Sequence, residues 1–413
     1  MSNKLNIGLF GFGCVGSGLY KVLNKSNLLD ASIRHIVVKD KEKERNLPKG
    51  VFSFDREVIL DDPEINVVVE LIDDAEAAYE IVTTAMKKGK HVVSANKKLI
   101  AEHLEELIEL KEQCGVSFLY EAAVCGSIPI IRNLEEYYNN DSLASVAGIC
   151  NGTTNYILSR LSREDKSFNE ILKDAQDEGF AESDPTLDID GFDAKYKLQL
   201  LVLHAFGLIT SPDEVLNFGI RHIKQEDVQF AREKGLRVRL IASAKKLEDG
   251  IAAYVAPQFV TADNFGYDVN NEFNAVAIEG LFADKQVFTG KGAGSFPTAS
   301  AVLSDVSALQ FDYDYEYRKR RSEQPGLFND YYVRIYLSSV DQYSLEKLDF
   351  AVVEEEFVSV NYSYRIGFVS FRDLTHSFYR SNPDLFISFF ENGEQTKEDP
   401  DYSGISIETL VLA

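Results

Sequence analysis

The chain has 413 residues, enough for two or three domains, and its 66 acidic and 43 basic residues give a formal net charge of −23. A surface of that charge repels nucleic acid and anionic membranes, so we expect small-molecule or protein partners. No apolar run reaches the roughly 18 residues of a membrane-spanning helix, no signal-peptide pattern is present, and the four cysteines lack C-x-x-C spacing, so we expect a cytoplasmic protein without zinc.

A glycine-rich turn follows the first predicted strand, residues 5–10, and precedes a predicted helix at 17–23. It matches the dinucleotide-binding pattern G-x-G-x-x-G, in which the first glycine permits a tight turn, the second lets the backbone approach a pyrophosphate and the third lets the helix pack against the strand. The residues expected to bind the cofactor here are Gly11, Phe12, Gly13, Cys14, Val15 and Gly16.

Further strands are predicted at residues 35–40, 66–72, 91–95 and 117–124, and helical segments separate most of them. This alternation predicts an α/β fold for residues 1–131, a Rossmann-type doubly wound parallel sheet.

The residues after the second strand bear on the choice between NAD and NADP. Asp40 could hold the ribose of NAD, whereas Lys39, Lys41, Lys43 and Arg45 could accept a 2′-phosphate. A solvated charged loop would explain most of these side chains with either cofactor. The sequence leaves both cofactors open and leans towards NADP.

A polar segment follows the fourth strand, with Ser94, Asn96 and Lys97 at the sheet edge where ligands bind in open α/β proteins. These residues are candidate cofactor contacts, although a lysine there is also compatible with an ordinary surface position. Residues 120–131 then predict a strand end, a turn of small residues and a helix that starts near Pro129.

Residues 132–296 predict an α+β domain that binds substrate and forms a dimer surface. A strand at 145–150 leads into the turn 151–155, which is rich in groups that cap helices or bind anions, and alternating strands fill residues 236–289. A glycine-rich turn and a helix at 297–310 follow. From residue 311 the chain becomes rich in aromatic residues, and we expect a separate small α/β or β domain over 311–413.

An acidic segment between Gly179 and Leu201 is the strongest candidate site in this second region. Five acids lie within a dozen residues, and a helix carrying Asp193 and Lys197 as an i,i+4 pair follows. An acidic loop with a surface salt bridge is the alternative. An EF-hand loop with Gly191 at its sixth position would end on Lys197 instead of glutamate, so calcium is excluded.

The chain resembles the homoserine dehydrogenase family, which interconverts L-homoserine and L-aspartate 4-semialdehyde with NAD(P), from its N-terminus to about residue 310. The blocks that carry the resemblance are GFGCVG (11–16), VVSANKKLIA (92–101), YEAAVCGSIPII (120–131), GICNGTTNYIL (148–158), GFAESDPTLDIDGFDAKYK (179–197) and GKGAGSFPTASAVLSD (290–305).

The resemblance implies roles for individual residues. Glu182, Asp188 and Asp193 would bind the substrate, and Lys97 and Lys197 would lie beside its reacting oxygen. Asp193 would also be catalytic, because it orients that oxygen. We expect Lys197 to transfer the proton with assistance from Lys97, because burial and a neighbouring cation both favour a neutral lysine.

The resemblance also implies further binding positions. Thr153 and Gly292 would contact the cofactor. A monovalent cation such as sodium would bind mainly to main-chain carbonyl oxygens, at the positions Glu121, Val124, Gly126 and Ile128.

Several positions depart from the family pattern. Asp73 and Asp74 replace a usual Gly-Gly pair, Cys125 and Ser127 replace glycines of the cation turn, and Lys291 replaces a proline. Two carboxylates near a pyrophosphate are repulsive unless they point away.

The C-terminal region resembles an ACT regulatory module without its Pro-Gly turn, so we expect a degenerate ACT-like fold that does not bind threonine. We expect a homodimer, a return of helix 297–310 to the Rossmann domain, and an active protein after deletion of residues 311–413. A dehydrogenase for another amino acid and a catalytically weakened regulatory homologue are the alternative functions.

Overall fold

The computed structural model describes residues 4–25, 29–140, 142–321, 326–376, 378–379, 382–395 and 408–410. The chain forms two compact units: the first comprises Met1–Ser142, Gln199–Pro212 and Phe288–Gln324, and the second comprises Leu143–Leu198, Asp213–Val287 and Pro325–Ala413. Both units are therefore discontinuous in sequence. The chain passes from one to the other within helix α10 (Phe192–Phe206) and strand β12 (Asp284–Lys291).

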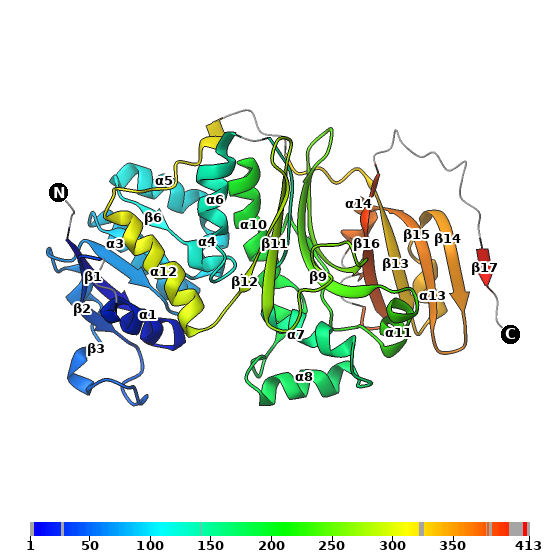
Figure 1. Ribbon diagram of the computed structural model, residues 1–413, viewed down its shortest axis with the longest axis horizontal. Coiled ribbons are helices and arrows are strands. Elements are labelled where there is room, and N and C mark those ends of the chain that lie inside the picture. The colour runs from blue at the N-terminus through cyan, green and yellow to red at the C-terminus, as the bar shows by residue number, and fades with distance from the viewer. Residues whose placement is uncertain are drawn as a thin grey trace. The chain divides into compact units, whose positions relative to one another are not determined.

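The first unit is built on a six-stranded parallel sheet with the strand order β3-β2-β1-β4-β5-β6 (Figure 1). Its strands are β1 (Leu5–Phe10), β2 (Ala31–Val37), β3 (Phe52–Ser53), β4 (Val67–Glu70), β5 (His91–Ser94) and β6 (Phe118–Leu119). The order reverses between β1 and β4, which is the point where nucleotides bind in doubly wound sheets. The predicted fold class of this region is confirmed.

Helices accompany this sheet, as expected for a buried parallel sheet. They are α1 (Cys14–Lys25), α2 (Glu57–Leu60), α3 (Ala75–Lys87), α4 (Lys97–Glu102), α5 (Leu104–Cys114), α6 (Ile130–Glu136), α12 (Ser295–Leu309) and the second part of α10, with 3-10 turns at Lys49–Val51, Glu121–Ala123, Tyr137–Asn140 and Arg318–Arg321. Helix α12 packs beside α1 (Figure 1): a Cβ on Gly18 would come 2.5 Å from the carbonyl oxygen of Ser295. The helix that was expected to return to the Rossmann domain thus lies in the first unit.

Two strands of the first unit differ from the sequence-based expectation. Strand β2 covers Ala31–Val37 instead of 35–40, so Lys39 and Asp40 lie beyond its end. Strand β6 has only Phe118 and Leu119, because the chain turns at Glu121, whose N–H donates to buried Asp305 Oδ2 (2.9 Å).

The second unit contains a mixed sheet with the order β12-β11-β7-β9-β10-β16-β13-β15-β14-β17, and β8 pairs with β10. Its strands besides β12 are β7 (Leu143–Ile149), β8 (Leu216–Asn217), β9 (Arg237–Lys246), β10 (Ile251–Val260), β11 (Phe273–Gly280), β13 (Tyr332–Ser339), β14 (Phe350–Val358), β15 (Ser363–Ser370), β16 (Leu385–Gln395) and β17 (Glu408–Leu410). Its helices besides the start of α10 are α7 (Gly152–Leu161), α8 (Phe168–Asp177), α9 (Thr186–Ile189), α11 (Gln225–Glu233), α13 (Gln342–Glu346) and α14 (Phe371–Leu374). No helix of the described ranges is both long and apolar enough to span a membrane.

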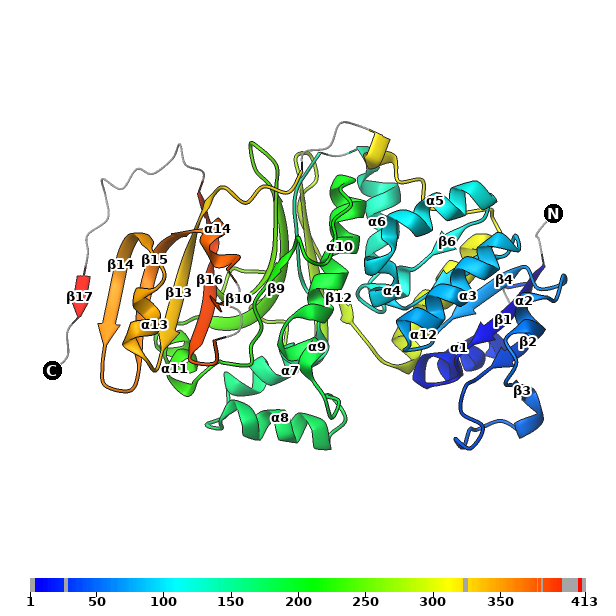
Figure 2. The same ribbon diagram turned by 180° about the vertical axis from the view of Figure 1, so that it is seen from behind.

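The C-terminal elements follow the order β13-α13-β14-β15-α14-β16, and the four strands form the antiparallel order β16-β13-β15-β14 (Figure 2). This is a ferredoxin-like β-α-β-β-α-β unit, which agrees with the expected ACT-like fold. The strand expected at 350–364 is divided into β14 and β15 by a turn in which Ser359 Oγ donates to the carbonyl of Tyr362 (2.6 Å).

The C-terminal region differs from the expected separate domain that begins at residue 311. Residues 311–321 belong to the first unit, and β16 continues the sheet of the second unit by pairing with β10 at Gln258↔Phe389 and Phe259↔Phe390. One apolar core also joins the two parts of this unit: Phe218 and Tyr254 pack with residues of β13, β15 and β16 such as Phe389. The aromatic residues of the C-terminal region therefore complete a core that the preceding strands begin.

Candidate active site

Asn151 lies at the centre of a buried polar cluster in the second unit. It is 5% exposed and stands between β7 and α7, where its Oδ1 accepts a hydrogen bond from the N–H of Thr154 (2.8 Å) and so caps α7. Its Nδ2 donates to Asp188 Oδ1 (2.7 Å) and to Asp193 Oδ2 (2.8 Å). One amide thus joins the start of α7 to two of the predicted substrate-binding acids.

The Asp193–Lys197 pair is part of this cluster. Lys197 Nζ lies 2.7 Å from Asp193 Oδ2 and 2.7 Å from the carbonyl oxygen of Cys150, and the two residues are 8% and 3% exposed. Burial on this scale excludes the alternative of a solvated surface salt bridge. A buried ion pair is costly to form, which is compatible with a functional role for these residues.

The other two candidates of this unit lie outside that hydrogen-bonded cluster. Glu182 has an exposed side chain, and its main-chain carbonyl accepts a hydrogen bond from Gln176 Nε2 (2.9 Å). Thr153, in the first turn of α7, donates from Oγ1 to the carbonyl of Phe180 (2.8 Å). Both stay predictions as substrate and cofactor contacts.

The glycine-rich turn of the first unit has the geometry that the dinucleotide fingerprint requires. Gly11 has φ +91°, and a Cβ there would lie 2.4 Å from the carbonyl oxygen of Leu71. A Cβ on Gly16 would lie 2.3 Å from the carbonyl oxygen of Gly11, so α1 begins close against the end of β1. Gly13 has no atom within 4 Å of a Cβ position, which leaves room for a phosphate beside the backbone.

Asp40 and Asp74 both use their carboxylates locally. Asp40 Oδ1 accepts the N–H groups of Glu42 (2.8 Å) and Lys43 (3.1 Å), and these hydrogen bonds lower the pKa of Asp40. Asp74 Oδ1 caps α3 by accepting the N–H of Ala77 (3.1 Å), and its Oδ2 lies 3.8 Å from Lys39 Nζ. The unusual acid at position 74 is therefore directed at a helix N-terminus and a lysine, which compensate its charge.

The turn predicted to bind a monovalent cation uses the side chain of Glu121 for a structural purpose. Both carboxylate oxygens of Glu121 accept N–H groups of α6, from Ile131 and Arg132 (2.9 Å each), and burial raises the pKa of Glu121 to about 7. The Glu121 carbonyl accepts a long hydrogen bond from the N–H of Val124 (3.4 Å), and the Ile128 carbonyl accepts one from the N–H of Ile130 (2.9 Å). A carbonyl oxygen has two lone pairs, so both retain the capacity for a cation. Among the described residues no cluster of three metal-binding side chains occurs.

Comparison with known proteins identifies the family to which these residues belong. A family model described as homoserine dehydrogenase matches residues 129–307, and one described as homoserine dehydrogenase, NAD binding domain, matches residues 11–121. A homoserine dehydrogenase of Bacillus subtilis is 38% identical over 314 residues, 74% of this chain and 72% of the relative. One of Helicobacter pylori is 35% identical over 375 residues, 87% of this chain and 88% of the relative.

The chain belongs to the homoserine dehydrogenase family. Solved structures agree with this result: a homoserine dehydrogenase from Thiobacillus denitrificans has a TM-score of 0.80 at 30% identity and covers 94% of this chain and 98% of its own. A hyperthermophilic archaeal homoserine dehydrogenase in complex with NADPH has a TM-score of 0.65 at 26% identity, over 76% of this chain and 99% of its own. As a homoserine dehydrogenase family member the protein is an oxidoreductase with a Rossmann NAD-binding domain.

Two residues of this homoserine dehydrogenase fold were not singled out as site residues from the sequence. The sequence places Asn151 in a turn whose groups cap helices or bind anions, and its bonds to Asp188 and Asp193 arise from tertiary structure. The second is Glu70, at the end of β4, and its signal was a single acid within the apolar run NVVVELI.

Glu70 connects the carboxyl ends of β4 and β5. Its Oε2 accepts a hydrogen bond from Ser94 Oγ (2.6 Å) and its Oε1 accepts one from the N–H of Ile72 (2.7 Å). Ser94 Oγ in turn accepts the N–H of Asn96 (3.1 Å), whose Oδ1 caps the helix that begins with Lys97. The predicted cofactor residues of this segment are thus held by a fully buried carboxyl group.

Glu70→Gln is expected to flatten the pH dependence of stability. Burial raises the pKa of Glu70 from 4.5 to about 7, so the folded protein keeps a proton there that the unfolded chain loses at lower pH. This group therefore lowers the free energy of unfolding as the pH rises between these two values. Chemical denaturation measures the free energy of unfolding at each pH. Between about pH 5 and about pH 8 this free energy should fall less in Glu70→Gln than in wild type.

Exposed Glu105 on α5 provides the matched control, because Glu105→Gln alters charge without changing a buried group. An equal loss of stability in Glu70→Gln and wild type would contradict the assigned titration.

Proposed function

We propose that the protein catalyses the NAD(P)-dependent interconversion of L-homoserine and L-aspartate 4-semialdehyde, in amino-acid biosynthesis. The buried Asn151–Asp193–Lys197 cluster carries this proposal within a chain of the homoserine dehydrogenase family. The acids supply acceptors for the substrate's ammonium group, and the lysine supplies a proton donor or acceptor next to them.

Lys197 is the proposed proton-transfer residue, with Lys97 as the assisting lysine. Asp193 and the Cys150 carbonyl hold the Lys197 ammonium in place, and the carboxylate stabilises its charged form. In the reduction direction the ammonium gives a proton to the carbonyl oxygen of the semialdehyde as hydride arrives at the carbon. In the oxidation direction the neutral amine takes the hydroxyl proton. The bound nicotinamide supplies or accepts the hydride.

The residues that would hold the cofactor lie at the carboxyl ends of the parallel strands in the first unit. The pyrophosphate would lie beside Gly13 at the start of α1, and Ser94 and Asn96 would contact the cofactor at the ends of β5 and α4. NADP is the proposed coenzyme. Exposed Lys39 beyond β2 could bind its 2′-phosphate, and the Asp40 carboxylate accepts N–H groups of its own turn, where it would otherwise bind the ribose of NAD. A main-chain monovalent-cation site at Glu121, Val124, Gly126 and Ile128 and a homodimeric assembly belong to the same proposal.

The initial rate of reduced-cofactor formation from L-homoserine, with NADP and NAD compared at mildly alkaline pH, tests this function. A clear rate that is higher with NADP is the expected result. A higher rate with NAD would contradict the coenzyme preference alone. Absence of a rate with both coenzymes, in a protein that melts cooperatively, would contradict the function and favour the catalytically weakened homologue.

Asn151→Asp is expected to raise the KM for L-homoserine about tenfold or more, because the two amide N–H donors are replaced by an oxygen that faces two carboxylates. The aspartate still caps α7, so the helix itself should be retained. The matched control is Ser167→Asp, which changes the N-cap residue of α8 to the same acid outside the cluster. Steady-state kinetics of both variants test this prediction. A KM for L-homoserine that is the same in Asn151→Asp as in Ser167→Asp would contradict a role for Asn151.

A further inference from the structure

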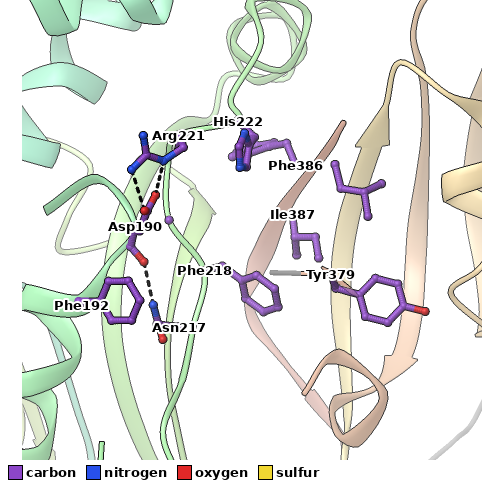
Figure 3. Close-up of a pocket in the computed structure, with 11 residues that line it drawn as sticks. Asp190, Phe192, Asn217, Phe218, Arg221, His222, Tyr379, Phe386 and Ile387 are labelled. Atoms are coloured by element: carbon purple, nitrogen blue, oxygen red, sulfur yellow. Dashed lines mark hydrogen bonds and ion pairs between the residues drawn. The ribbon is translucent and has the colours of Figure 1, made fainter. Parts of the chain in front are cut away.

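Arg221 forms an ion pair with Asp190, one of the five acids in the segment that follows Gly179. Its Nε lies 2.7 Å from Asp190 Oδ1, and its Nη2 lies 2.7 Å from Asp190 Oδ2 (Figure 3). In this bidentate geometry a guanidinium fixes both the position and the orientation of a carboxylate. Asp190 is the C-cap residue of α9, the short helix that carries Asp188, so Arg221 is connected to a predicted substrate-binding acid.

Helix α9 is too short to hold its own position. It has four residues, and isolated helices of that length are unstable because their few hydrogen bonds do not offset the entropy lost on ordering the first turn. Gly191, with φ +83°, changes the chain direction before α10 begins, so α9 does not continue the longer helix. The orientation of α9 therefore depends on contacts from other parts of the chain.

The guanidinium of Arg221 contacts both ends of α9. Besides its two bonds to Asp190, it donates from Nη2 to Oγ1 of Thr186 (3.2 Å), the first residue of the helix. The N–H donors of a guanidinium have a fixed planar arrangement. One rigid group thus sets the first residue of α9 and its C-cap residue relative to each other.

Two further bonds support the C-terminal end of α9. Asn217 Nδ2 donates to the carbonyl of Asp190 (2.8 Å), and the N–H of Ile220 donates to the carbonyl of Ile189 (2.7 Å). The chain that leads to Arg221 therefore runs along this end of the helix, and the Arg221 side chain extends the contact to the other end.

Asp188 lies inside α9 and joins it to the buried polar cluster, since its Oδ1 accepts a hydrogen bond from Asn151 Nδ2 (2.7 Å). Asp193 and Lys197 lie instead on α10, where their four-residue spacing pairs them directly (2.7 Å). A shift of α9 would thus move Asp188 relative to Asn151 while the ion pair on α10 stays intact.

We propose that Arg221 is a positioning residue for substrate binding. By bonding both ends of α9, it holds the helix in the orientation that directs Asp188 to Asn151 and to the ammonium group of the substrate. Loss of this contact weakens substrate binding, whereas proton transfer by Lys197 continues. The identity of that substrate, L-homoserine, rests on the proposed function.

The ion pair can be removed without leaving a buried charge. It lines a cavity of about 520 Å³, and the side chains of Arg221 and Asp190 are 38% and 28% exposed (Figure 3). Water therefore hydrates the Asp190 carboxylate once the guanidinium is absent. Because exposed ion pairs contribute little to global stability, Arg221→Ala should fold and melt cooperatively.

Arg221→Ala is expected to raise the KM for L-homoserine about tenfold and to leave kcat nearly unchanged. Arg334→Ala is the matched control, because Arg334 Nε lies 2.7 Å from Glu354 Oε2 in a partly exposed pair that joins β13 to β14. This control should keep the wild-type KM. An unchanged KM in Arg221→Ala, or a fall in kcat as large as the rise in KM, would overturn the inference.

Asp190→Asn distinguishes positioning through the ion pair from a direct effect of the Arg221 charge on the substrate. This variant keeps the guanidinium charge but loses its charged bidentate partner, so its KM should also rise about tenfold. The double variant Arg221→Ala/Asp190→Asn should show about the same tenfold rise, since both changes remove one interaction. An unchanged KM in Asp190→Asn, or a rise of about a hundredfold in the double variant, would show separate effects and overturn the inference.

Hydrogen exchange followed by mass spectrometry tests the positioning of α9 without turnover. The N–H of Ile189 donates to the Pro185 carbonyl (2.9 Å), and that of Asp190 donates to the Thr186 carbonyl (3.1 Å). Both amides should exchange about tenfold faster in Arg221→Ala than in the control variant or in wild type. Equal exchange rates in the three proteins would overturn the inference even in an inactive protein. A wild-type protein without dehydrogenase activity would contradict the proposed function, which this measurement does not require.

Discussion

Lys197→Ala is expected to lower kcat for L-homoserine oxidation about a hundredfold or more, because the variant lacks the group that takes the hydroxyl proton. The side chain is buried and bonded to Asp193 and to the Cys150 carbonyl, so solvent water does not replace it at the same position. The KM for the coenzyme should change little, since the glycine-rich turn belongs to the first unit. Steady-state and single-turnover rates, with coenzyme affinity measured by calorimetry, test this result.

Loss of folding must be distinguished from loss of chemistry in this variant. Removing the ammonium deprives the buried Asp193 carboxylate of one partner, and disruption of such pairs costs roughly 3–5 kcal/mol. The double variant Lys197→Ala/Asp193→Asn removes the unpaired charge and should recover stability without recovering the rate. Lys195→Ala is the matched control, because Lys195 is also buried on α10 but lies two positions away and therefore on another face. A Lys197→Ala enzyme that keeps more than about a tenth of the wild-type rate would contradict the assignment.

The parts of this site that depend on local pattern were predictable from the sequence. The spacing of Gly11, Gly13 and Gly16 determines a turn whose φ value and close approaches depend on few neighbouring residues. The four-residue spacing of Asp193 and Lys197 places them on one helix face, and the structure shows them 2.7 Å apart. In both cases short-range geometry is sufficient.

The parts that depend on tertiary contacts were not predictable in the same way. Asn151 and Asp193 are far apart in sequence, and the pattern of the turn at 151–155 showed a cap without its second role. The charge of Asp74 suggested repulsion of a pyrophosphate, whereas its carboxylate caps α3 and faces Lys39. The aromatic C-terminal region suggested a separate domain because composition does not indicate which core a side chain joins.

Because the C-terminal region contributes to the cores of both units, deletion of residues 311–413 is expected to give an insoluble protein, in contrast to the active protein expected from the sequence. The deleted segment, residues 311–413, supplies side chains to both cores. In the first unit, Tyr315 Oη accepts the N–H of Tyr120 (3.3 Å), and Tyr317 Oη lies 3.1 Å from Tyr120 Oη, all three side chains being buried. In the second unit, Phe218 and Tyr254 lose the packing of β13, β15 and β16.

The magnitudes support an all-or-none effect. Truncation of one buried aromatic side chain costs about 3–5 kcal/mol, whereas a whole domain is stable by about 5–15 kcal/mol. Loss of several such residues in each unit therefore exceeds the stability available. Expression of the truncated chain, followed by size-exclusion chromatography and thermal melting, should show aggregates without a cooperative transition.

A chain that ends at Gln395 is the matched control, because it keeps β16 and both cores while still lacking the residues beyond that strand. It should be soluble and melt cooperatively, which would show that the loss comes from the missing cores and not from truncation itself. A soluble and active protein ending at residue 310 would contradict the shared core and restore the C-terminal region as an independent module. Under the shared core, substitutions in β16 should affect the stability of the second unit, because Phe389 packs against Phe218 and Tyr254.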